Sequence, residues 1–491
     1  MKYLYSTLLL IIYTSGFSQV STSAEDILQS LKIQNELIEN SIVKNLEFKN
    51  IGPSVMSGRV TDLEVNPNNP SEFYVAYASG GLWHTVNNGN TFTPIMDNSD
   101  TQNIGDFDID WSTRLIIVGT GENNSSRSSY AGVGILKSND NGKTWKNIGL
   151  NDSHHIGKIV INPNNPNEIV VAVLGHLYSK NKERGIFKTI DGGVTWENTL
   201  YIDESTGIID LDISPNNFKI QFASSWQKSR KAWDFKGNGE KSGIYKSVDS
   251  GNTWNLISTQ KSGFPTGNGV GRIGLAVFDS KTLYAVVDNQ FRRPKSKAST
   301  EKTDLSKNYF ESISKERFLK IDDLKLDKFL TTNSFPKKYN STKIKELVKN
   351  DLIKPSDLKL YLEDANTVMF ETPIIGAQVY RSDDGGLNWT LKNSYYLDRL
   401  YNTYGYYFGK IHVSPMNKDN IYIYGVPFIK SNDGGVTYKS IDYPNVHVDH
   451  HDLWINPKNP KHLINGNDGG VNISYDNGEN WLKFNQPSVG Q

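Results

Sequence analysis

The octapeptide SNDNGKTW at Ser138–Trp145 recurs along most of the chain and decides the fold. Its pattern is Ser/Thr-x-Asp-x-Gly-x-Thr/Asn-Trp/Tyr. The further copies that keep the aspartate are Thr189–Trp196, Ser247–Trp254, Ser382–Trp389, Ser431–Tyr438 and Ser474–Trp481. A weaker copy, Thr85–Phe92, has Asn87 in place of the aspartate. Copies spaced by about 50 residues indicate one supersecondary unit repeated around an axis.

Each copy has the composition of a tight hairpin turn. The aspartate carboxylate can accept backbone N–H groups across the turn, and the glycine can adopt the positive φ that such a turn requires. The closing aromatic residue is then available to pack between neighbouring repeats. The octapeptide therefore predicts a structural hairpin rather than a catalytic motif.

A second landmark precedes each octapeptide. It is an apolar strand, a turn that usually contains proline, and another strand. The clear examples are Leu63–Ala78, Ile159–Leu174, Leu211–Ser224, Ile411–Val426 and Leu453–Asn467, and the degenerate ones are Phe107–Gly121 and Leu275–Asp288. Seven strand pairs alternating with seven hairpins predict an all-β fold. We expect a seven-bladed β-propeller of four-stranded antiparallel blades over residues 49–491.

Two segments depart from this repeat. Apolar residues at helical spacing in Ala24–Glu47 predict an amphipathic helix within a lead-in over residues 19–48. An extra segment at about residues 297–363 is rich in Lys, Asp and Leu and poor in glycine. Its helical periodicity predicts a helical insertion on a blade loop, where long insertions cost little stability.

The first residues have the features of a secretory signal peptide. Lys2 precedes an apolar run from Leu8 to Tyr13, and small residues follow near Gly16 and Ser18. The run is too short for a membrane span, and no later segment approaches 18 consecutive apolar residues. We therefore expect a signal peptide over residues 1–18 and an exported protein that is periplasmic, on the cell surface or extracellular.

Composition excludes several functional classes. The sequence has no cysteine, which rules out disulfides, thiol catalysis and thiolate metal sites. Lys+Arg and Asp+Glu each number 53, so the net charge is zero and nothing favours nucleic acid as a partner.

The first strands of the seven repeats share a register. The positions two and four residues before the turn proline are apolar in every repeat, which predicts a buried strand face. The position five residues before it is occupied by Asp62, Asp106, Lys158, Asp210, Gly274, Lys410 and Asp452. Because the innermost strand borders the channel of a propeller, we expect these charges to ring one mouth of it. They either compensate one another or act on a ligand in a shared funnel.

Candidate site residues follow from this register and from the blade loops. The catalytic candidates are Asp62, Asp106, Asp210 and Asp452, and the binding candidates are Arg59, His155, Lys158, Arg272, Tyr404, Tyr407 and Lys410. Two polar loops, Gly121–Gly132 with Glu122 and Trp226–Asp234 with Arg230, could face the same funnel. The sequence of Asn467–Gly470 predicts a tight turn.

The segment HVDHHD at His447–Asp452 has the highest density of groups that can bind a metal. On a strand, His447, Asp449 and His451 would share one face, and these ligand types suit zinc or another divalent ion. The alternative is a hydrogen-bonded polar network at the channel mouth. Asp152, His154 and His155 occupy a similar place before the third blade. A divalent metal is the one cofactor that the sequence suggests.

The octapeptides resemble the Asp-box (BNR) repeat. The wider sequence resembles a family of exported, sortilin-like bacterial propeller proteins that are often called glycosyl hydrolases. The matching stretches are NIGPSVMSGRVTDLEVNP from Asn50, GLNDSHHIGKIVINP from Gly149, LGHLYSKNKERGIFKT from Leu174, YLEDAN from Tyr361, and HVDHHDLWINPKNPKHLINGNDGGVNISYDNGENW from His447. The resemblance covers nearly all of the chain beyond the signal peptide. Relatives continue beyond FNQPSVGQ, so further blades or a second propeller are expected in the intact protein.

The resemblance implies two enzymatic analogies that the residues support weakly. Xyloglucanase-type glycosidases place an aspartate general base before a Gly-Gly pair on the first blade, whereas this chain has Ser79 there. Those enzymes also set their site between two propellers. Sialidases need an arginine triad and a tyrosine nucleophile, for which Arg59 is a weak substitute.

These departures favour binding over catalysis. We expect a propeller that binds a polysaccharide, peptide or protein partner at its channel-mouth loops, as sortilin-type propellers do. The alternative is a xyloglucanase-like glycoside hydrolase that uses paired carboxylates. A third possibility is a pseudo-enzyme or assembly factor that needs a partner subunit.

Overall fold

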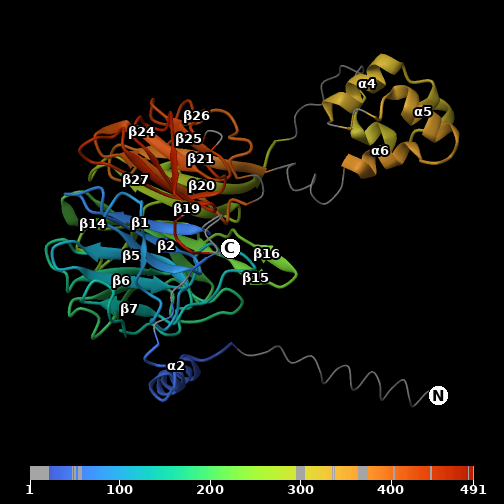
Figure 1. Ribbon diagram of the computed structural model, residues 1–491. Coiled ribbons are helices and arrows are strands. Elements are labelled where there is room, and N and C mark those ends of the chain that lie inside the picture. Colours follow the sequence, from blue (N-terminus) through green and yellow to red (C-terminus); the bar gives the residue numbers. More distant parts are fainter. Residues whose placement is uncertain are drawn as a thin grey trace, which may run out of the picture.

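The computed structural model describes residues 21–46, 48, 51–52, 58–294, 305–333, 335–336, 338–362, 374–401, 404–442, 445–484 and 486–489. Seven four-stranded antiparallel sheets form a closed propeller, as predicted (Figure 1). The predicted signal peptide lies outside the described residues. No helix in the described part of the chain is long and apolar enough to span a bilayer.

Each blade is built from four strands that are in order along the chain. Blade 1 comprises β1 (Val60–Val65), β2 (Phe73–Tyr77), β3 (Gly81–Thr85) and β4 (Thr93–Pro94), and blade 2 comprises β5 (Ile104–Asp110), β6 (Leu115–Thr120), β7 (Ile135–Ser138) and β8 (Lys146–Asn147). Blade 3 comprises β9 (Ile156–Ile161), β10 (Ile169–Val173), β11 (Gly185–Thr189) and β12 (Glu197–Leu200). Blade 4 comprises β13 (Thr206–Ser214), β14 (Asn217–Gln227), β17 (Gly243–Ser247) and β18 (Asn255–Leu256). A hairpin of β15 (Ser229–Lys231) and β16 (Asp234–Lys236) extends from blade 4.

Blade 5 comprises β19 (Val270–Val277), β20 (Leu283–Arg292), β21 (Ile374–Ser382) and β22 (Thr390–Leu391). Blade 6 comprises β23 (Lys410–Ser414), β24 (Asn417–Tyr424), β25 (Phe428–Ser431) and β26 (Lys439–Ser440). Blade 7 comprises β27 (His450–Ile455), β28 (Leu463–Asn467), β29 (Gly470–Ser474) and β30 (Leu482–Phe484). The first strand of each blade contacts the first strands of both neighbours, and β1 contacts β27. These seven strands therefore form the inner ring around the channel.

The predicted buried face of the inner strands is confirmed at the position four residues before the turn, whereas two residues before the turn Ile213 and Val413 are only partly buried. The side chains four residues before the turn are all at most 4% exposed: Leu63, Phe107, Ile159, Leu211, Leu275, Ile411 and Leu453. They pack with residues of adjacent blades into shared hydrophobic clusters, so the core lies between the blades as well as within them.

The octapeptides form the predicted turns between the third and fourth strands. In the copy at Ser138, the Asp140 carboxylate accepts the Thr144 N–H at 2.9 Å and the Thr144 hydroxyl at 2.6 Å. The Trp145 indole N–H donates to the Ile95 carbonyl of the preceding blade at 2.8 Å. The turn thus fixes its own hairpin and also links two blades.

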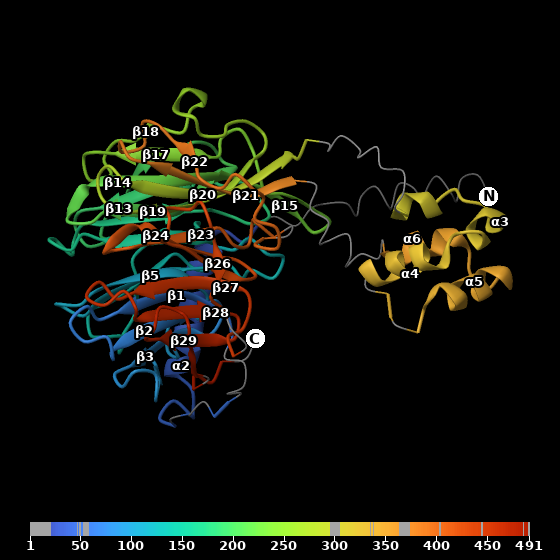
Figure 2. The same ribbon diagram turned by 90° about the horizontal axis from the view of Figure 1, so that it is seen from above.

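Helices occur where the sequence predicts them. Helix α2 (Ala24–Glu39) ends before the predicted limit because Asn40 caps it, with its side-chain amide donating to Glu36 O at 2.7 Å. The insertion between β20 and β21 contains a 3-10 helix (Lys307–Phe310) and helices α3 (Lys315–Leu319), α4 (Asp323–Thr332), α5 (Ser341–Lys349) and α6 (Pro355–Leu362). Its hydrophobic core uses only its own residues, and Figure 2 shows it beside the propeller.

Candidate functional site

Two sets of loops share one face of the propeller, called the loop face below. They are the connections from one blade to the next and the loops between the second and third strands of each blade. Because the strands are antiparallel, the proline turns and the octapeptide turns lie together on the opposite face. The helical insertion and the β15–β16 hairpin both extend from the loop face.

The predicted charge ring is present at the start of the inner strands. The Lys158 ammonium lies 2.8 Å from Asp106 Oδ1 and 3.5 Å from Asp62 Oδ1. The Lys410 ammonium lies 3.5 Å from Asp452 Oδ1 and donates to the Thr61 carbonyl at 3.1 Å. Burial alone would lower the pKa of Lys158, but Asp106, Asp62 and Asp452 raise it well above its usual value. The lysine is therefore charged.

Three of these carboxylates also join neighbouring blades. Asp62 accepts the Phe107 N–H of blade 2 at 3.1 Å. Asp106 accepts the Ile159 N–H of blade 3 at 2.7 Å, and Asp210 accepts the Leu275 N–H of blade 5 at 2.9 Å. Asp108 and Asp212 repeat the contact one layer deeper, with the N–H groups of Ile161 and Val277.

These contacts give the ring a structural function. A carboxyl group that accepts a backbone N–H is held in place. Burial raises the pKa of Asp106 and of Asp210, although the nearby lysines, and for Asp210 also the Leu275 N–H, oppose that rise. The channel beside the ring contains a cavity of about 240 Å³, lined by Lys158, Asp210, Asp212, Lys410, His412 and Asp452. Catalytic roles for Asp62, Asp106, Asp210 and Asp452 stay a prediction.

Arg59 is at the centre of an ionic network at the channel mouth. Its guanidinium pairs with Glu122 and with Asp468, whose Oδ1 lies 3.2 Å from Arg59 Nε. Asp468 also accepts from His451 Nε2 at 2.8 Å. Burial raises the pKa of Glu122 despite Arg59, whereas the hydrogen bond from His451 and the Arg59 charge together lower the pKa of Asp468 against burial. Blades 1, 2 and 7 thus meet through one arginine.

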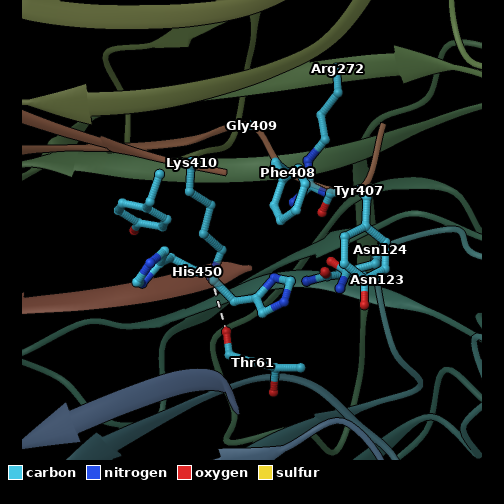
Figure 3. A pocket seen from close by; sticks show the side chains of 11 residues that line it. Thr61, Asn123, Asn124, Arg272, Tyr407, Phe408, Gly409, Lys410 and His450 are labelled. Atoms are coloured by element: carbon cyan, nitrogen blue, oxygen red, sulfur yellow. Dashed lines mark hydrogen bonds between the residues drawn. The ribbon is translucent and has the colours of Figure 1, made fainter. Parts of the chain in front are cut away.

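A small polar pocket lies beside this network (Figure 3). Its lining comes from five blades: Thr61, Asn123, Asn124, Arg272, Tyr407, Phe408, Gly409, Lys410, Tyr424, His450 and His451. Figure 3 shows Arg272 and Lys410 entering it, with the dashed line joining Lys410 to Thr61. Its free volume is about 10 Å³, room for roughly one water molecule. A sugar ring does not fit there without movement of side chains.

The predicted binding residues lie around this mouth. His155 is buried and its Nδ1 lies 2.7 Å from the Glu122 carbonyl oxygen. Tyr407 stacks under Arg59, with the guanidinium carbon 5.0 Å from the ring centroid, and Tyr404 packs near Tyr406. The aromatic run therefore packs partly into the core between blades 5 and 6, and Tyr407 also contributes to the mouth.

Four buried cations on the loop face have no carboxylate within ion-pair distance among the described residues. They are Arg184, Lys228, Arg230 and Arg272, each at most 6% exposed, and are called the basic cluster below. Arg184 and Lys228 both donate to the His176 carbonyl, at 2.8 and 3.4 Å. Arg230 lies over the Phe235 ring at 3.9 Å. Burial, with Arg184 and Arg230 nearby, lowers the pKa of Lys228 well below its usual value.

Arg272 connects this cluster to the pocket. Its guanidinium donates to the carbonyls of Tyr406 and Tyr407 at 3.2 and 3.3 Å. Tyr406 also lies against Arg230, whose guanidinium carbon is 5.2 Å from its ring centroid. Burial lowers the pKa of Arg272 to about 10, even with Asp210 and Asp288 nearby. Arg272 is therefore a buried guanidinium at the mouth with no carboxylate within ion-pair distance among the described residues.

The strand argument for a metal at His447, Asp449 and His451 is wrong, because β27 begins at His450 and Asp449 has a left-handed φ of 65°. His447 Nδ1 lies 2.6 Å from the Val448 carbonyl, and His451 is bonded to Asp468. Their ligand atoms do not form a set within 4.8 Å. Among the described residues, one such set exists, and it consists of Asp152, His154 and His176.

Ser79 lines a separate hollow of about 280 Å³ between blades 1 and 2, with Arg59, Tyr77, Ala78, Glu122, Ser128, Tyr130 and Val489. Glu122 is therefore the carboxylate that accompanies Ser79 in this hollow. Glu122 lies in the polar loop after β6, a loop that the sequence indicated could face the channel.

Sequence reasoning missed Asp468, His176 and Lys228. Asp468 was interpreted only as a turn residue, and the other two lie in loops between second and third strands. The available signal was topological, since these loops share a face with the connections between blades.

No protein-family model matches the chain, and no curated protein matches it in a sequence comparison. Solved structures do match. An ancestral GH74 enzyme aligns with a TM-score of 0.52 at 13% identity, over 89% of this chain and 48% of that one. This chain thus spans about half the length of that enzyme.

Two other solved structures are similar at lower scores. YCF48 bound to D1 peptide aligns at 11% identity over 88% of this chain and 98% of that one, with a TM-score of 0.45. The GH74 xyloglucanase from Xanthomonas campestris aligns at 11% identity over 88% and 68%, with a TM-score of 0.40. At these identities the likeness extends to the β-propeller fold alone.

Proposed function

We propose that the protein is a recognition propeller whose loop face binds a peptide or protein partner through an acidic group. One observation carries the proposal. The carboxylates of the ring and of the Arg59 network already face cations or backbone donors, whereas no carboxylate of the described residues lies within ion-pair distance of the basic cluster. A buried cation without a counter-ion is costly, and an acidic ligand would relieve that cost.

The form of the mouth supports recognition of side chains rather than of a sugar ring. The pocket at Arg272 has room for about one water molecule, and its lining combines charged, amide and aromatic side chains. Arg272 and Arg230 are both arginines held by aromatic and carbonyl contacts, which leaves planar guanidinium groups suited to a carboxylate.

A glycoside hydrolase is the second candidate, and one observation favours it. Glu122 and Asp468 flank Arg59 beside the hollow that contains Ser79, and their pKa values are shifted in opposite directions. Two carboxyl groups with divergent pKa values can serve as acid and base in such chemistry.

One pair of assays tests both candidates on the full chain. A decapeptide rich in glutamate should bind, and its glutamine counterpart should bind at least about tenfold more weakly, since hydrogen bonds to charged groups contribute roughly 1.5–3 kcal/mol. Arg230→Met and Arg272→Met should each weaken the glutamate peptide by about tenfold, whereas Lys182→Met, which removes an exposed lysine of blade 3, should not.

The contrary results are equally specific. Equal binding of the two peptides would contradict recognition of an acidic group. Release of reducing sugar from a polysaccharide panel, abolished by Glu122→Gln, would establish the hydrolase instead.

A further inference from the structure

Three side chains from two loops of blade 3 meet at the loop face. Asp152 and His154 precede β9, and His176 follows β10. Their ligand atoms all lie within 4.8 Å of one another. We propose that Asp152, His154 and His176 bind a divalent transition metal ion, with zinc the best match to two imidazoles and one carboxylate.

The spacing of two of the groups already fits an ion. His176 Nε2 lies 3.1 Å from Asp152 Oδ1. Tetrahedral zinc with ligands at about 2.0–2.2 Å separates ligand atoms by roughly 3.3–3.5 Å. The two side chains would need to separate by only a few tenths of an ångström to admit the ion between them.

His154 supplies the observation that a hydrogen-bonded network alone does not explain. Its Nε2 is buried and has no hydrogen-bond partner among the described residues. The ring stacks on His176 with centroids 3.6 Å apart, and the residue adopts a left-handed φ of 56°. A buried, unpaired ring nitrogen on a strained backbone costs stability, and a metal bond would use that nitrogen.

The surrounding groups hold the ligands as an outer shell does. Ser179 Oγ lies 2.7 Å from His176 Nδ1, which leaves Nε2 for the ion. The Asn181 amide donates to the Asp152 carbonyl at 2.6 Å and to its Oδ2 at 3.3 Å. A metal-binding histidine usually makes such a contact through its other ring nitrogen.

Charges of both signs lie near the site, and the Arg184 charge opposes a bound cation while it orders the loop. The Arg184 guanidinium donates to the carbonyls of Leu174, His176 and Ser179, so it fixes the loop that contains His176. The Glu183 carboxylate accepts the Asp152 N–H at 2.8 Å and adds a second negative charge. The Asp152 side chain is 33% exposed, which gives an ion access from solvent and leaves a fourth position for water.

Metal titration of the full chain tests the proposal. After treatment with a chelator and its removal, ZnCl₂ is titrated by calorimetry and CoCl₂ by visible absorption. We expect one saturable ion per chain and the visible absorption band of tetrahedral cobalt. His176→Gln and His154→Gln should each weaken binding by roughly 100-fold or more, and circular dichroism would verify that both variants fold.

The matched control is His447→Gln, which removes a histidine of the segment that the sequence favoured. It should leave the metal affinity unchanged. The proposal is overturned if no saturable site of one ion appears. It is also overturned if metal binding survives unchanged in both His154→Gln and His176→Gln.

Discussion

At the scale of single residues, the inner-strand aspartates show how one position can look catalytic and act structurally. The sequence correctly placed four carboxylates and two lysines around one channel. It could not show that Asp62, Asp106 and Asp210 each accept an N–H from an adjacent inner strand, because that contact depends on the packing of neighbouring blades. Their carboxyl groups therefore help to hold the inner ring together through these hydrogen bonds.

Lys228 gives the clearest residue-scale prediction. It is 6% exposed, and its ammonium donates a long hydrogen bond of 3.4 Å to the His176 carbonyl. Burial and the nearby Arg184 and Arg230 lower the pKa of Lys228 well below its usual value, so burying this amine costs stability. Replacing it by an apolar side chain of similar length removes that cost. We expect Lys228→Met to stabilise the free protein by about 1–3 kcal/mol, measured from the urea midpoint.

The same variant should lose affinity for the glutamate peptide, so stability and binding should change in opposite directions. Lys219→Met, at an exposed position of the same blade, is the control and should change neither. A lower urea midpoint for Lys228→Met would mean that its ammonium is well satisfied in the native state.

At the scale of elements, the octapeptide turn was predictable in detail because all of its contacts are local. The structure also explains the copy at Thr85–Phe92, which has Asn87 in place of the aspartate. Asn87 accepts the Thr91 N–H at 2.9 Å and donates to the Thr91 hydroxyl at 2.9 Å, so asparagine forms the same turn without a charge. Elements defined by contacts distant in sequence were less predictable, as the start of β27 shows.

The charged copies should make stability depend on pH in a defined window. Hydrogen bonds from Thr144 lower the pKa of Asp140 to about 2. For Asp249 and Asp433 burial is the largest single influence and raises the pKa, but the hydrogen bonds from Thr253 and Thr437 and their neighbours together lower it to about 2. An aspartate whose folded pKa lies below its unfolded value of about 3.9 stabilises the fold above that value. This contribution is lost as the pH falls from about 4 to 2.

A triple variant isolates this contribution. The difference in urea midpoint between the wild type and Asp140→Asn/Asp249→Asn/Asp433→Asn should be constant above pH 5 and should vanish near pH 2. Because the three side chains are largely exposed, salt should reduce the difference. A difference that stays constant down to pH 2 would contradict a charge effect.

At the scale of the whole molecule, repeat counting gave the blade number and the position of the helical insertion. The candidate site was harder, because its residues come from blades 1, 2, 5, 6 and 7 and meet only when the ring closes. In the described chain, no covalent bond joins the first blade to the last. Blade 7 meets blade 1 through side-chain packing, the Arg59–Asp468 pair and a hydrogen bond from Asn88 to Tyr475.

Two equivalent glycines allow this closing interface to be compared with an internal one. A Cβ added to Gly466 would lie 2.3 Å from Val60 Cγ1 of blade 1, and one added to Gly119 would lie 2.4 Å from Ile156 Cγ2 of blade 3. Valine at either position therefore overpacks an interface between blades by a similar amount, at a cost of roughly 1–3 kcal/mol. The chain joins blade 2 to blade 3, but it does not join blade 7 to blade 1.

We therefore expect the two substitutions to cause similar steric clashes but to differ in how often the strands at each interface open to solvent. In hydrogen exchange, Gly466→Val should increase exchange in β1, β27 and β28 by about tenfold, which corresponds to a cost near 1.4 kcal/mol. Gly119→Val should change β5, β6 and β9 less, because the connection between blades 2 and 3 limits their separation. Equal increases at both interfaces would mean that the propeller opens no more readily where its first and last blades meet than between blades joined by the chain.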